Sequence, residues 1–352
     1  MQAQVVVPVH RLDRPLRRAV ESVLESEDFG VVIVAHGVAP EQLDYPQDPR
    51  VDILSVNEGI GHPGVAFNRG FEATSADWVG ILGSDDWYEQ GALEAMLQHA
   101  LDDRADGVLA PYKKDPEGAN VGIPVTWRRR RLRAAEDRLF WRASPLGLYK
   151  RELMVQERYQ FDEEVCAGVD QLNSTLLWTG GHSISYYPWD PAYVVGGRPG
   201  DHVSRVSRSM REHGRIFVKL WNTPEVQALP LKDLRALAHR MLTIHVFSLL
   251  SPRSEASMWD PDDFQWLQEL ALLMEEHAPG MSRRLPLSHR RIYNHLLQGD
   301  LQATLAEVNN ASYLTNRLPS ELGSLLDGEF WIYRKPGEWA SRIRHISEKG
   351  TK

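Results

Sequence analysis

Short apolar runs alternate with amphipathic segments through the first half of the chain, and this alternation constrains the fold more than any other feature. Runs typical of buried strands occupy residues 4–9, 31–35, 51–55, 77–82 and 106–110. Apolar residues recur at helical spacing over 16–24, about 65–74 and 91–101. Strands that alternate with helices build a largely parallel sheet with helices on both faces. Such a sheet binds its ligands beyond the carboxyl ends of its strands.

The pattern changes near residue 203, where strand signals end and long helical periods begin. A broken apolar stripe runs through 234–249, and Asp260-Pro261 is typical of the start of a further helix. A chain of 352 residues is long enough for about two domains. We therefore predict an α/β domain over 1–210 and an α-helical domain over 211–352.

The charge balance and the single cysteine narrow the classes of function. The chain has 40 basic and 48 acidic residues, and its net charge of −8 disfavours a nucleic-acid binder, which requires a broad basic face. Cys166 alone can form neither an internal disulfide nor a CxxC zinc site. The N-terminus lacks the pattern of a signal peptide, and the apolar stretch 241–250 is too short to span a membrane. We expect a cytoplasmic protein, with attachment to a membrane surface and the oligomeric state left open.

A pair of acidic residues follows one of the predicted strands. The segment Gly83-Ser84-Asp85-Asp86-Trp87 comes directly after the apolar run 77–82, at the edge where a parallel sheet binds ligands. Because Mg²⁺ commonly joins one or two carboxylates to substrate phosphates, this position suits a metal-bound diphosphate. The alternative interpretation is that Asp85 or Asp86 caps the next helix.

A glycine-rich segment offers a different interpretation. Gly59-Ile60-Gly61-His62-Pro63-Gly64 has the spacing G-x-G-x-x-G between a predicted strand and a predicted helix, and Asp85 follows about twenty residues later. This layout is typical of a dinucleotide-binding fingerprint and would indicate an NAD(P)-dependent oxidoreductase. Asn57 and Glu58 separate the strand from the first glycine, and Pro63 stiffens the turn. These features favour an ordinary strand-to-helix connection.

Several further segments gain meaning from their order. They are VVVPVHRLDRPLRRAVESVL from residue 5, VVIVAHG from 31, NEGIG from 57, GVAFNRGFEATSADWVGILGSDDWYEQGALEAM from 64, FDEE from 161, GVD from 168 and WTGG from 178. Together they resemble the family 2 glycosyltransferases over roughly residues 4–206. The resemblance implies a GT-A fold, which is a Rossmann-like, mostly parallel sheet flanked by helices, and a nucleotide-diphospho-sugar donor.

The resemblance also implies a role for each matching residue. Asp85 would hold a divalent metal, Mn²⁺ or Mg²⁺, on the donor diphosphate, with His202 close to it. Asp170 would be the general base of an inverting transfer. The donor contacts implied by the resemblance and the acidic motif are Pro8, Val9, His10, Asn57, Asn68, Ser84, Asp85 and Asp86.

Three positions depart from the family's pattern. Gly83 replaces the first acid of the D-x-D motif, and Ala35-His36 replaces the usual acidic pair after the second strand. Phe67 replaces the arginine that usually precedes the donor-side asparagine. These departures bear on the donor base and the diphosphate contacts. They also leave open a non-catalytic GT-A-like domain that binds a glycan.

Three surface features add expectations about ligands. The loop 196–201 contains three glycines and is expected to close over the donor, which would bring Arg198 and His202 towards the diphosphate. The arginines within 128–133 suit a phosphate-bearing acceptor or anionic lipid headgroups, or form a solvated helical face. Aromatic side chains that could stack on sugars or close a core edge are Tyr186, Tyr187, Trp189 and Tyr193.

The resemblance thus implies a metal-dependent, inverting glycosyltransferase with a C-terminal α-helical domain. It would move a sugar from a nucleotide-diphospho-sugar to a hydroxyl group of a glycan or lipid-linked acceptor. The habit of the family points to cell-surface polysaccharide synthesis, in the cytoplasm and at the inner face of the membrane. No nucleic-acid partner is expected.

Overall fold

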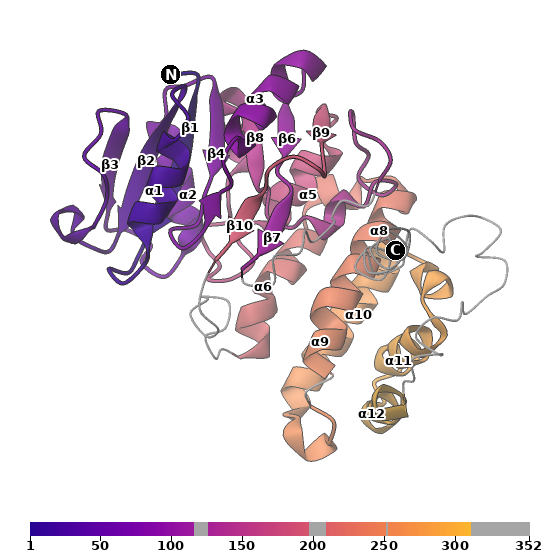
Figure 1. Ribbon diagram of the computed structural model, residues 1–352. Coiled ribbons are helices and arrows are strands. Elements are labelled where there is room, and N and C mark those ends of the chain that lie inside the picture. The colour runs from indigo at the N-terminus through magenta and orange to yellow at the C-terminus, as the bar shows by residue number, and fades with distance from the viewer. Residues whose placement is uncertain (116–125, 197–208, 251–252, 311–352) are drawn as a thin grey trace, which may run out of the picture. The chain divides into compact units, whose positions relative to one another are not determined.

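The computed structural model describes residues 1–115, 126–196, 209–250 and 253–310 (Figure 1). The chain divides into two compact units. The first comprises Met1–Arg133 and Arg142–Arg208, and the second comprises Ala134–Trp141 and Ser209–Lys352. The short segment 134–141 therefore belongs with the later part of the chain, although the sequence placed it inside the first domain.

The first unit is built on a seven-stranded sheet with the order β3-β2-β1-β4-β8-β6-β9 (Figure 1). All of its strands run in one direction except β8, which is antiparallel to both neighbours. The strands are β1 (Ala3–Val9), β2 (Phe29–His36), β3 (Val51–Val56), β4 (Trp78–Ile81), β6 (Gly107–Leu109), β8 (Gly147–Lys150) and β9 (Ile184–Tyr186). A second sheet has the order β5-β10-β7, with β5 (Trp87–Tyr88), β7 (Tyr112–Lys114) and β10 (Tyr193–Val195). This architecture confirms the predicted α/β class.

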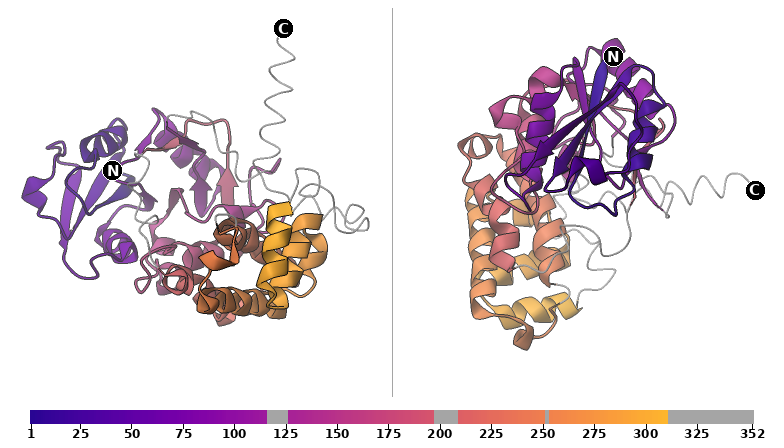
Figure 2. Two further views of the ribbon diagram at one scale, coloured as in Figure 1. Left: turned by 90° about the horizontal axis from the view of Figure 1, so that it is seen from below. Right: turned by 90° about the vertical axis from the view of Figure 1, so that its left-hand side faces the viewer.

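Helices cover both faces of the large sheet (Figure 2). They are α1 (Leu16–Leu24), α2 (Pro63–Ala73), α3 (Ala92–Asp103), α4 (Arg151–Met154) and α5 (Gln171–Thr179), with short 3₁₀ turns η1 (Pro40–Gln42) and η3 (Glu157–Tyr159). Because side chains alternate along a strand, Val5 packs with Val20 of α1 and Leu93 of α3 on one face. On the other face Gly70 brings α2 so close to β1 that an added Cβ would meet Val6. Each such fully buried aliphatic side chain contributes about 1.5–3 kcal/mol.

The order of the strands shows at which point of the sheet a ligand is expected to bind. The chain runs outward from β1 through β2 to β3, and then returns to β4 on the opposite side of β1. Ligands of open α/β sheets bind at such a switch point, in the crevice beyond the carboxyl ends of the strands. The crevice expected here opens between β1 and β4, next to His10 and the turn 82–86.

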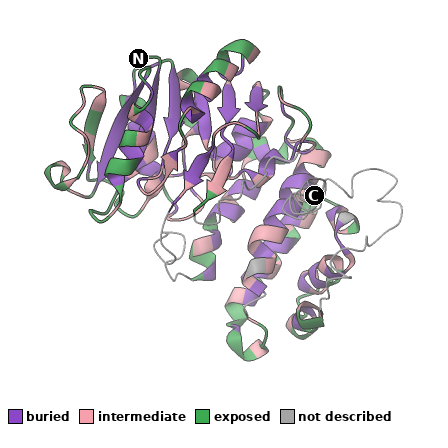
Figure 3. Cartoon of the chain, in the orientation of Figure 1, coloured by how far each residue is buried: buried purple, intermediate pink, exposed green. Residues whose placement is uncertain are grey.

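In the described part of the second unit, the regular elements are all helices, joined by short loops. Its helices are η2 (Leu139–Trp141), α6 (Met210–Trp221), α7 (Pro224–Gln227), α8 (Leu231–Met241), the π-helical turn η5 (Leu242–Val246), α9 (Phe247–Leu250), η6 (Ala256–Met258), α10 (Pro261–His277), η7 (Met281–Arg284), α11 (Leu287–Leu297) and α12 (Leu301–Asn310). The predicted start of α10 is confirmed, since Asp260 caps it by accepting the Asp262 N–H at 2.9 Å. These helices carry buried residues along much of their length (Figure 3). Within the described ranges, no helix is both long and apolar enough to cross a bilayer.

Candidate active site

The acidic turn between β4 and β5 is tied to two other strands. Leu82 N–H donates to Val6 O of β1 at 3.0 Å, which extends the pairing of β4 beyond its last residue. Asp86 N–H donates to Gly83 O at 3.0 Å and closes the turn. Gly83 N–H donates to the hydroxyl of Tyr193, from β10, at 3.0 Å. The turn is therefore held in a fixed conformation at the switch point.

Asp85 is paired with arginines that precede and begin α1. Its carboxylate forms an ion pair with Arg14, and the two side chains are only 16% and 8% exposed. The guanidinium of Arg18 donates to Asp85 O at 2.8 Å and lies over the Trp87 ring, 3.7 Å from its centroid. One guanidinium thus pairs with the carboxylate that was predicted to face the diphosphate, and a second binds the backbone of the same residue. The sequence analysis did not identify either arginine.

Asp86 has a different environment from its neighbour. Its carboxylate accepts hydrogen bonds from the Tyr193 hydroxyl and, at 2.8 Å, from Gly196 N–H. Burial raises the pKa of Asp86 to about 7, although these hydrogen bonds oppose the shift. Asp86 therefore ties the turn to the end of β10. The helix-cap alternative is wrong for both acids, because the N-cap of α3 is Gly91 and no side chain caps that helix.

The environment of Gly83 explains why the first acid of a D-x-D motif is missing. A Cβ added at this residue would meet the Asp86 carboxylate, and it would lie 3.3 Å from Asp85 Oδ1. A third carboxylate here would be crowded against two others. The glycine is thus a consequence of the inward position of Asp86. Ser84, the remaining residue of the motif, is buried within the turn.

Two histidines lie at the carboxyl ends of β1 and β2. His10 directly follows β1, and partial desolvation together with the charges of Arg14 and Arg11 holds its pKa below the ordinary value. His36 is buried, and its Nε2 lies 2.9 Å from Glu58 O. Both imidazoles add polar groups to the predicted crevice. Pro8 and Val9 are the last residues of β1 rather than loop residues, and the fully buried Val9 can reach a ligand only through its backbone.

The two asparagines predicted on the donor side lie in different environments. Asn57 is exposed directly after β3, at the carboxyl edge of the sheet. Asn68 is 1% exposed, and its amide hydrogen-bonds Phe161 N–H, Phe161 O and Glu163 Oε1, each at 2.9 Å. The predicted contact between Asn68 and the sugar nucleotide is therefore wrong, because the Asn68 amide binds the FDEE segment (161–164) to α2. Phe67 stacks on Phe161, 4.7 Å between centroids, within the same cluster.

Asp170 occupies the N-cap position of α5, but its side chain does not cap the helix. The carboxylate accepts a hydrogen bond from the Ser144 hydroxyl and a longer one, at 3.3 Å, from the Gln171 amide. Its side chain is half-buried. Both of these partners are neutral, in contrast to the arginines beside Asp85. Among the described residues, the groups that orient this carboxylate are uncharged.

Ser144 also fixes where Asp170 lies. Because β8 is antiparallel, its first residues lie at the edge where the parallel strands end, with Leu148 opposite Gly80 of β4. Ser144 comes three residues before β8 begins. Asp170 and Asp85 therefore lie at the same edge of the sheet. The sequence motifs predicted both acids, and the antiparallel strand brings them to this common edge.

The glycine-rich segment 59–64 does not form a dinucleotide-binding site. A Cβ added at Gly64 would meet the backbone of Asp162, so protein rather than a ligand covers the start of α2. The segment follows β3, whereas Asp85 follows β4, and β2 and β1 lie between those strands. That separation of three strand spacings is about 14 Å. The oxidoreductase interpretation is therefore wrong.

The other predicted ligand contacts have mixed outcomes. Arg198, His202 and the loop expected to close over the donor lie, apart from Gly196, outside the described residues. Arg130, from the arginine cluster, pairs with Asp103 at 2.6 Å.

The described residues contain no group of three or more His, Cys, Asp or Glu side chains suited to a metal ion. Asp85 nevertheless fits a cation held mainly by donor phosphates and water, since Mg²⁺ needs only one or two protein carboxylates.

Comparison with known proteins supports the predicted family. The sequence profile described as "Glycosyl transferase family 2" matches residues 4–155. The chain is 21% identical over 215 residues to "Poly(ribitol-phosphate) beta-N-acetylglucosaminyltransferase TarS" of Staphylococcus aureus (strain Mu50 / ATCC 700699), which covers 58% of this chain and 37% of TarS. It is 21% identical over 189 residues to the TarP enzyme of the same description from strain N315, which covers 49% of this chain and 55% of TarP. The chain thus matches about half or less of each relative's length.

Solved structures give the same result for the fold. The structure described as "Crystal structure of S. aureus TarS 1-349 in complex with UDP-GlcNAc" is similar with a TM-score of 0.72 at 17% identity, over 88% of this chain and 91% of that chain. The structure of TarS 1-349 alone gives a TM-score of 0.70 at 15% identity, over 89% and 93%. This similarity confirms the predicted GT-A-like fold.

Proposed function

Because residues 4–155 match the profile of the family 2 glycosyltransferases, we propose that this chain is an inverting glycosyltransferase. It moves a sugar from a nucleotide-diphospho-sugar to a hydroxyl group of a glycan or lipid-linked acceptor. The observation that carries the proposal is the pair of carboxylates at one edge of the sheet. Asp85 lies among positive charges, and Asp170 lies among neutral hydrogen-bond donors.

Asp170 is the general base in this proposal. As the acceptor oxygen forms its bond to the anomeric carbon, the hydroxyl proton moves to the Asp170 carboxylate. The bond from that carbon to the diphosphate oxygen breaks, and the nucleoside diphosphate leaves with the electron pair. Ser144 keeps the carboxylate oriented, and a positioned base of this kind contributes about 10²–10⁴-fold to the rate.

The residues around Asp85 stabilise the diphosphate. Arg14 and Arg18 are placed to offset the charge that develops on the leaving group, and electrostatic stabilisation is usually the largest catalytic contribution. Arg14 would take the role of the arginine that Phe67 replaces. A divalent cation held by Asp85, with His10 and His202 as further candidate ligands, would add charge to the same phosphates.

We further propose UDP-GlcNAc as the first donor to test, since a TarS structure of the same fold contains it. The descriptions of the relatives suggest a polyol-phosphate polymer as acceptor and hence a role in cell-surface polysaccharide synthesis. Such acceptors are assembled at the inner face of the membrane, which is where we expect the protein to act. His36 is near the ends of β1 and β2 and is our candidate for contact with the nucleotide base.

Release of UDP tests this proposal. The purified chain with UDP-GlcNAc, Mn²⁺ and poly(ribitol phosphate) should release UDP and label the polymer, and chelation of the metal should slow the reaction. Slow UDP release without polymer would also support an enzyme. Tight donor binding without transfer or hydrolysis, across UDP- and GDP-sugars, would instead establish the non-catalytic glycan-binding alternative.

A further inference from the structure

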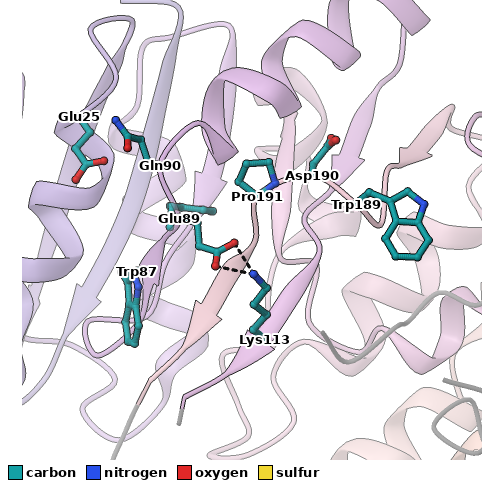
Figure 4. Close-up of a pocket in the computed structure, with 9 residues that line it drawn as sticks. Glu25, Trp87, Glu89, Gln90, Lys113, Trp189, Asp190 and Pro191 are labelled. Carbon is teal, nitrogen blue, oxygen red and sulfur yellow. Dashed lines mark hydrogen bonds and ion pairs between the residues drawn. The ribbon is translucent and has the colours of Figure 1, made fainter. Parts of the chain in front are cut away.

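A cavity lies on the small sheet of the first unit, apart from the acidic turn. Its volume is about 560 Å³, which is within the range of about 300–1,000 Å³ for small-molecule sites. Side chains from β5, β7 and the segment before β10 surround it (Figure 4). Those used below are Trp87, Glu89, Lys113, Trp189 and Asp190. None of them belongs to the carboxylate pair.

Trp189 gives the cavity an accessible aromatic surface. Its side chain is 86% exposed, whereas Tyr186 and Tyr193 are buried in the core. Tyr187 stacks on His99 with 3.5 Å between ring centroids. Of the four aromatic residues that the sequence singled out for stacking on sugars, Trp189 is thus the one whose ring is open to a ligand. Amphipathic aromatic rings of this kind suit the flat C–H face of a pyranose.

The charged groups of the cavity favour a neutral, hydroxyl-rich ligand. Glu89 is held by Lys113, with Nζ 2.6 and 2.8 Å from its two oxygens, and it also accepts Ala192 N–H at 2.8 Å. Asp190 lies 2.9 Å from His99 Nε2. The cation of Lys113 is therefore already compensated, and a phosphate would meet three carboxylates, those of Glu25, Glu89 and Asp190. Sugar hydroxyls, in contrast, can donate to carboxylates and accept from ammonium groups.

The position of the cavity connects it with the acidic turn. The strand β10 leads from the cavity at Pro191 to Gly196, whose N–H binds Asp86. Five residues of extended chain span about 16 Å. One wall of the cavity is Trp87, and the arginine stacked on that ring, Arg18, donates to Asp85 O. A carbohydrate chain of a few units could extend from one site to the other along the small sheet.

We propose that this cavity is a subsite for a neutral pyranose unit of the acceptor chain, with Trp189 as its stacking platform. The inference rests on the proposed function, because it takes the acceptor to carry neutral pyranose units, which a bare polyol-phosphate chain lacks. The subsite holds the chain at a distance from the reacting hydroxyl. It would therefore raise the affinity for long acceptors and leave the donor reaction unchanged.

Calorimetry of the full chain with N-acetylchitotetraose, cellotetraose and maltotetraose tests the subsite directly. We expect at least one of these probes to bind with millimolar affinity, and Trp189→Ala to weaken that binding about tenfold. Trp127→Ala is the matched control, since Trp127 is 93% exposed and does not line the cavity. This control should bind like the wild-type protein.

Three results would overturn the subsite. They are no binding of any probe at about 20 mM, equal binding by wild type and Trp189→Ala, and equal weakening by both tryptophan variants. UDP release from UDP-GlcNAc without acceptor, measured on the same samples, separates this test from that of the proposed function. Trp189→Ala should release UDP at the same rate as the wild type, because the subsite binds the acceptor chain and not the donor. This result does not depend on which polymer is the acceptor.

Discussion

The acidic turn after β4 and the start of α5 each present a carboxylate at one edge of the sheet, but their surroundings differ. Asp85 lies beside Arg14 and Arg18, in a turn that is fastened to β1 and β10. Asp170 is oriented by a serine hydroxyl and an amide. The first environment is rigid and rich in positive charge, and the hydrogen-bond partners in the second, among the described residues, are neutral.

This difference indicates a division of labour. A site that binds a diphosphate benefits from fixed positive charge, because no reorganisation is then needed as the leaving group departs. A general base requires the opposite, since an adjacent guanidinium would lower the pKa of the carboxyl and weaken it as a proton acceptor. Each prediction below tests one side of this comparison.

The largest effect is expected from Asp170→Asn. The amide keeps the shape of the side chain but cannot accept the acceptor proton, so the transfer rate should fall by about 10²–10⁴-fold. Donor affinity and melting temperature should remain close to those of the wild type. Ser144→Ala, which keeps the carboxylate and removes only its orienting hydroxyl, should reduce the rate much less. Equal losses in both variants would show that the region has only a structural role.

Arg14→Ala tests whether the positive charge beside Asp85 binds the donor diphosphate. Loss of a charge-assisted hydrogen bond of about 1.5–3 kcal/mol should weaken UDP-GlcNAc binding by about 10–150-fold in calorimetry. Arg17→Ala is the matched control, because Arg17 lies three residues further along, at the start of α1, and pairs with the exposed Asp44. The control should bind the donor normally. Unchanged donor affinity in Arg14→Ala would remove this arginine from the diphosphate site.

Gly83→Asp restores the missing acid of the D-x-D motif and should nevertheless be harmful. Its Cβ would meet the Asp86 carboxylate, and such overpacking costs about 1–3 kcal/mol of stability. We expect a lower free energy of unfolding by chemical denaturation and no gain in Mn²⁺ affinity. Tighter Mn²⁺ binding at unchanged stability would show that the turn has room for a third carboxylate.

Asp86→Asn should change how the stability of the protein depends on pH. The pKa of Asp86 is raised from 3.8 to about 7, so the folded chain retains a proton that the unfolded chain releases between these values. The free energy of unfolding of the wild type therefore falls as pH rises through this window, by at most about 1.4 kcal/mol per pH unit. The asparagine variant should lack this component, and its stability relative to wild type should increase from pH 5 to about pH 7. Parallel pH profiles of the two proteins would contradict the buried position of Asp86.

The sequence predicted those parts of the fold that have long, uniform patterns. The strands β1 to β4 and β6 follow apolar runs, and the helices beside them show helical spacing. The strands β5, β7, β9 and β10 contain two or three residues each, which is too short for an alternation to be recognised. The strand β6 is as short, but the run 106–110 around it indicated a strand. The antiparallel strand β8 is also short, and its direction depends on the whole sheet. The small second sheet, and the cavity upon it, could therefore not be predicted.

The candidate active site could likewise be predicted from the sequence only in part. Asp85 and Asp170 could be predicted because each belongs to a local motif of ordered residues. The ion pair of Asp85 with Arg14 joins residues 71 positions apart and depends on β1 lying beside β4. The roles of Asn68 and Asp86 also depend on distant partners, which are Phe161 and Tyr193. Motifs identified the acids, but the tertiary contacts determine what each acid does.

Asp85→Asn and Asp170→Asn, measured side by side, test the division of labour most directly. Calorimetry with Mn²⁺ and UDP-GlcNAc reports donor affinity, and UDP release with the polymer acceptor reports turnover. Asp85→Asn should lose metal-dependent donor binding, whereas Asp170→Asn should bind the donor as tightly as the wild type and fail to transfer it. A folded Asp170→Asn protein that transfers sugar at the wild-type rate, or the same loss of donor affinity in both variants, would contradict the account.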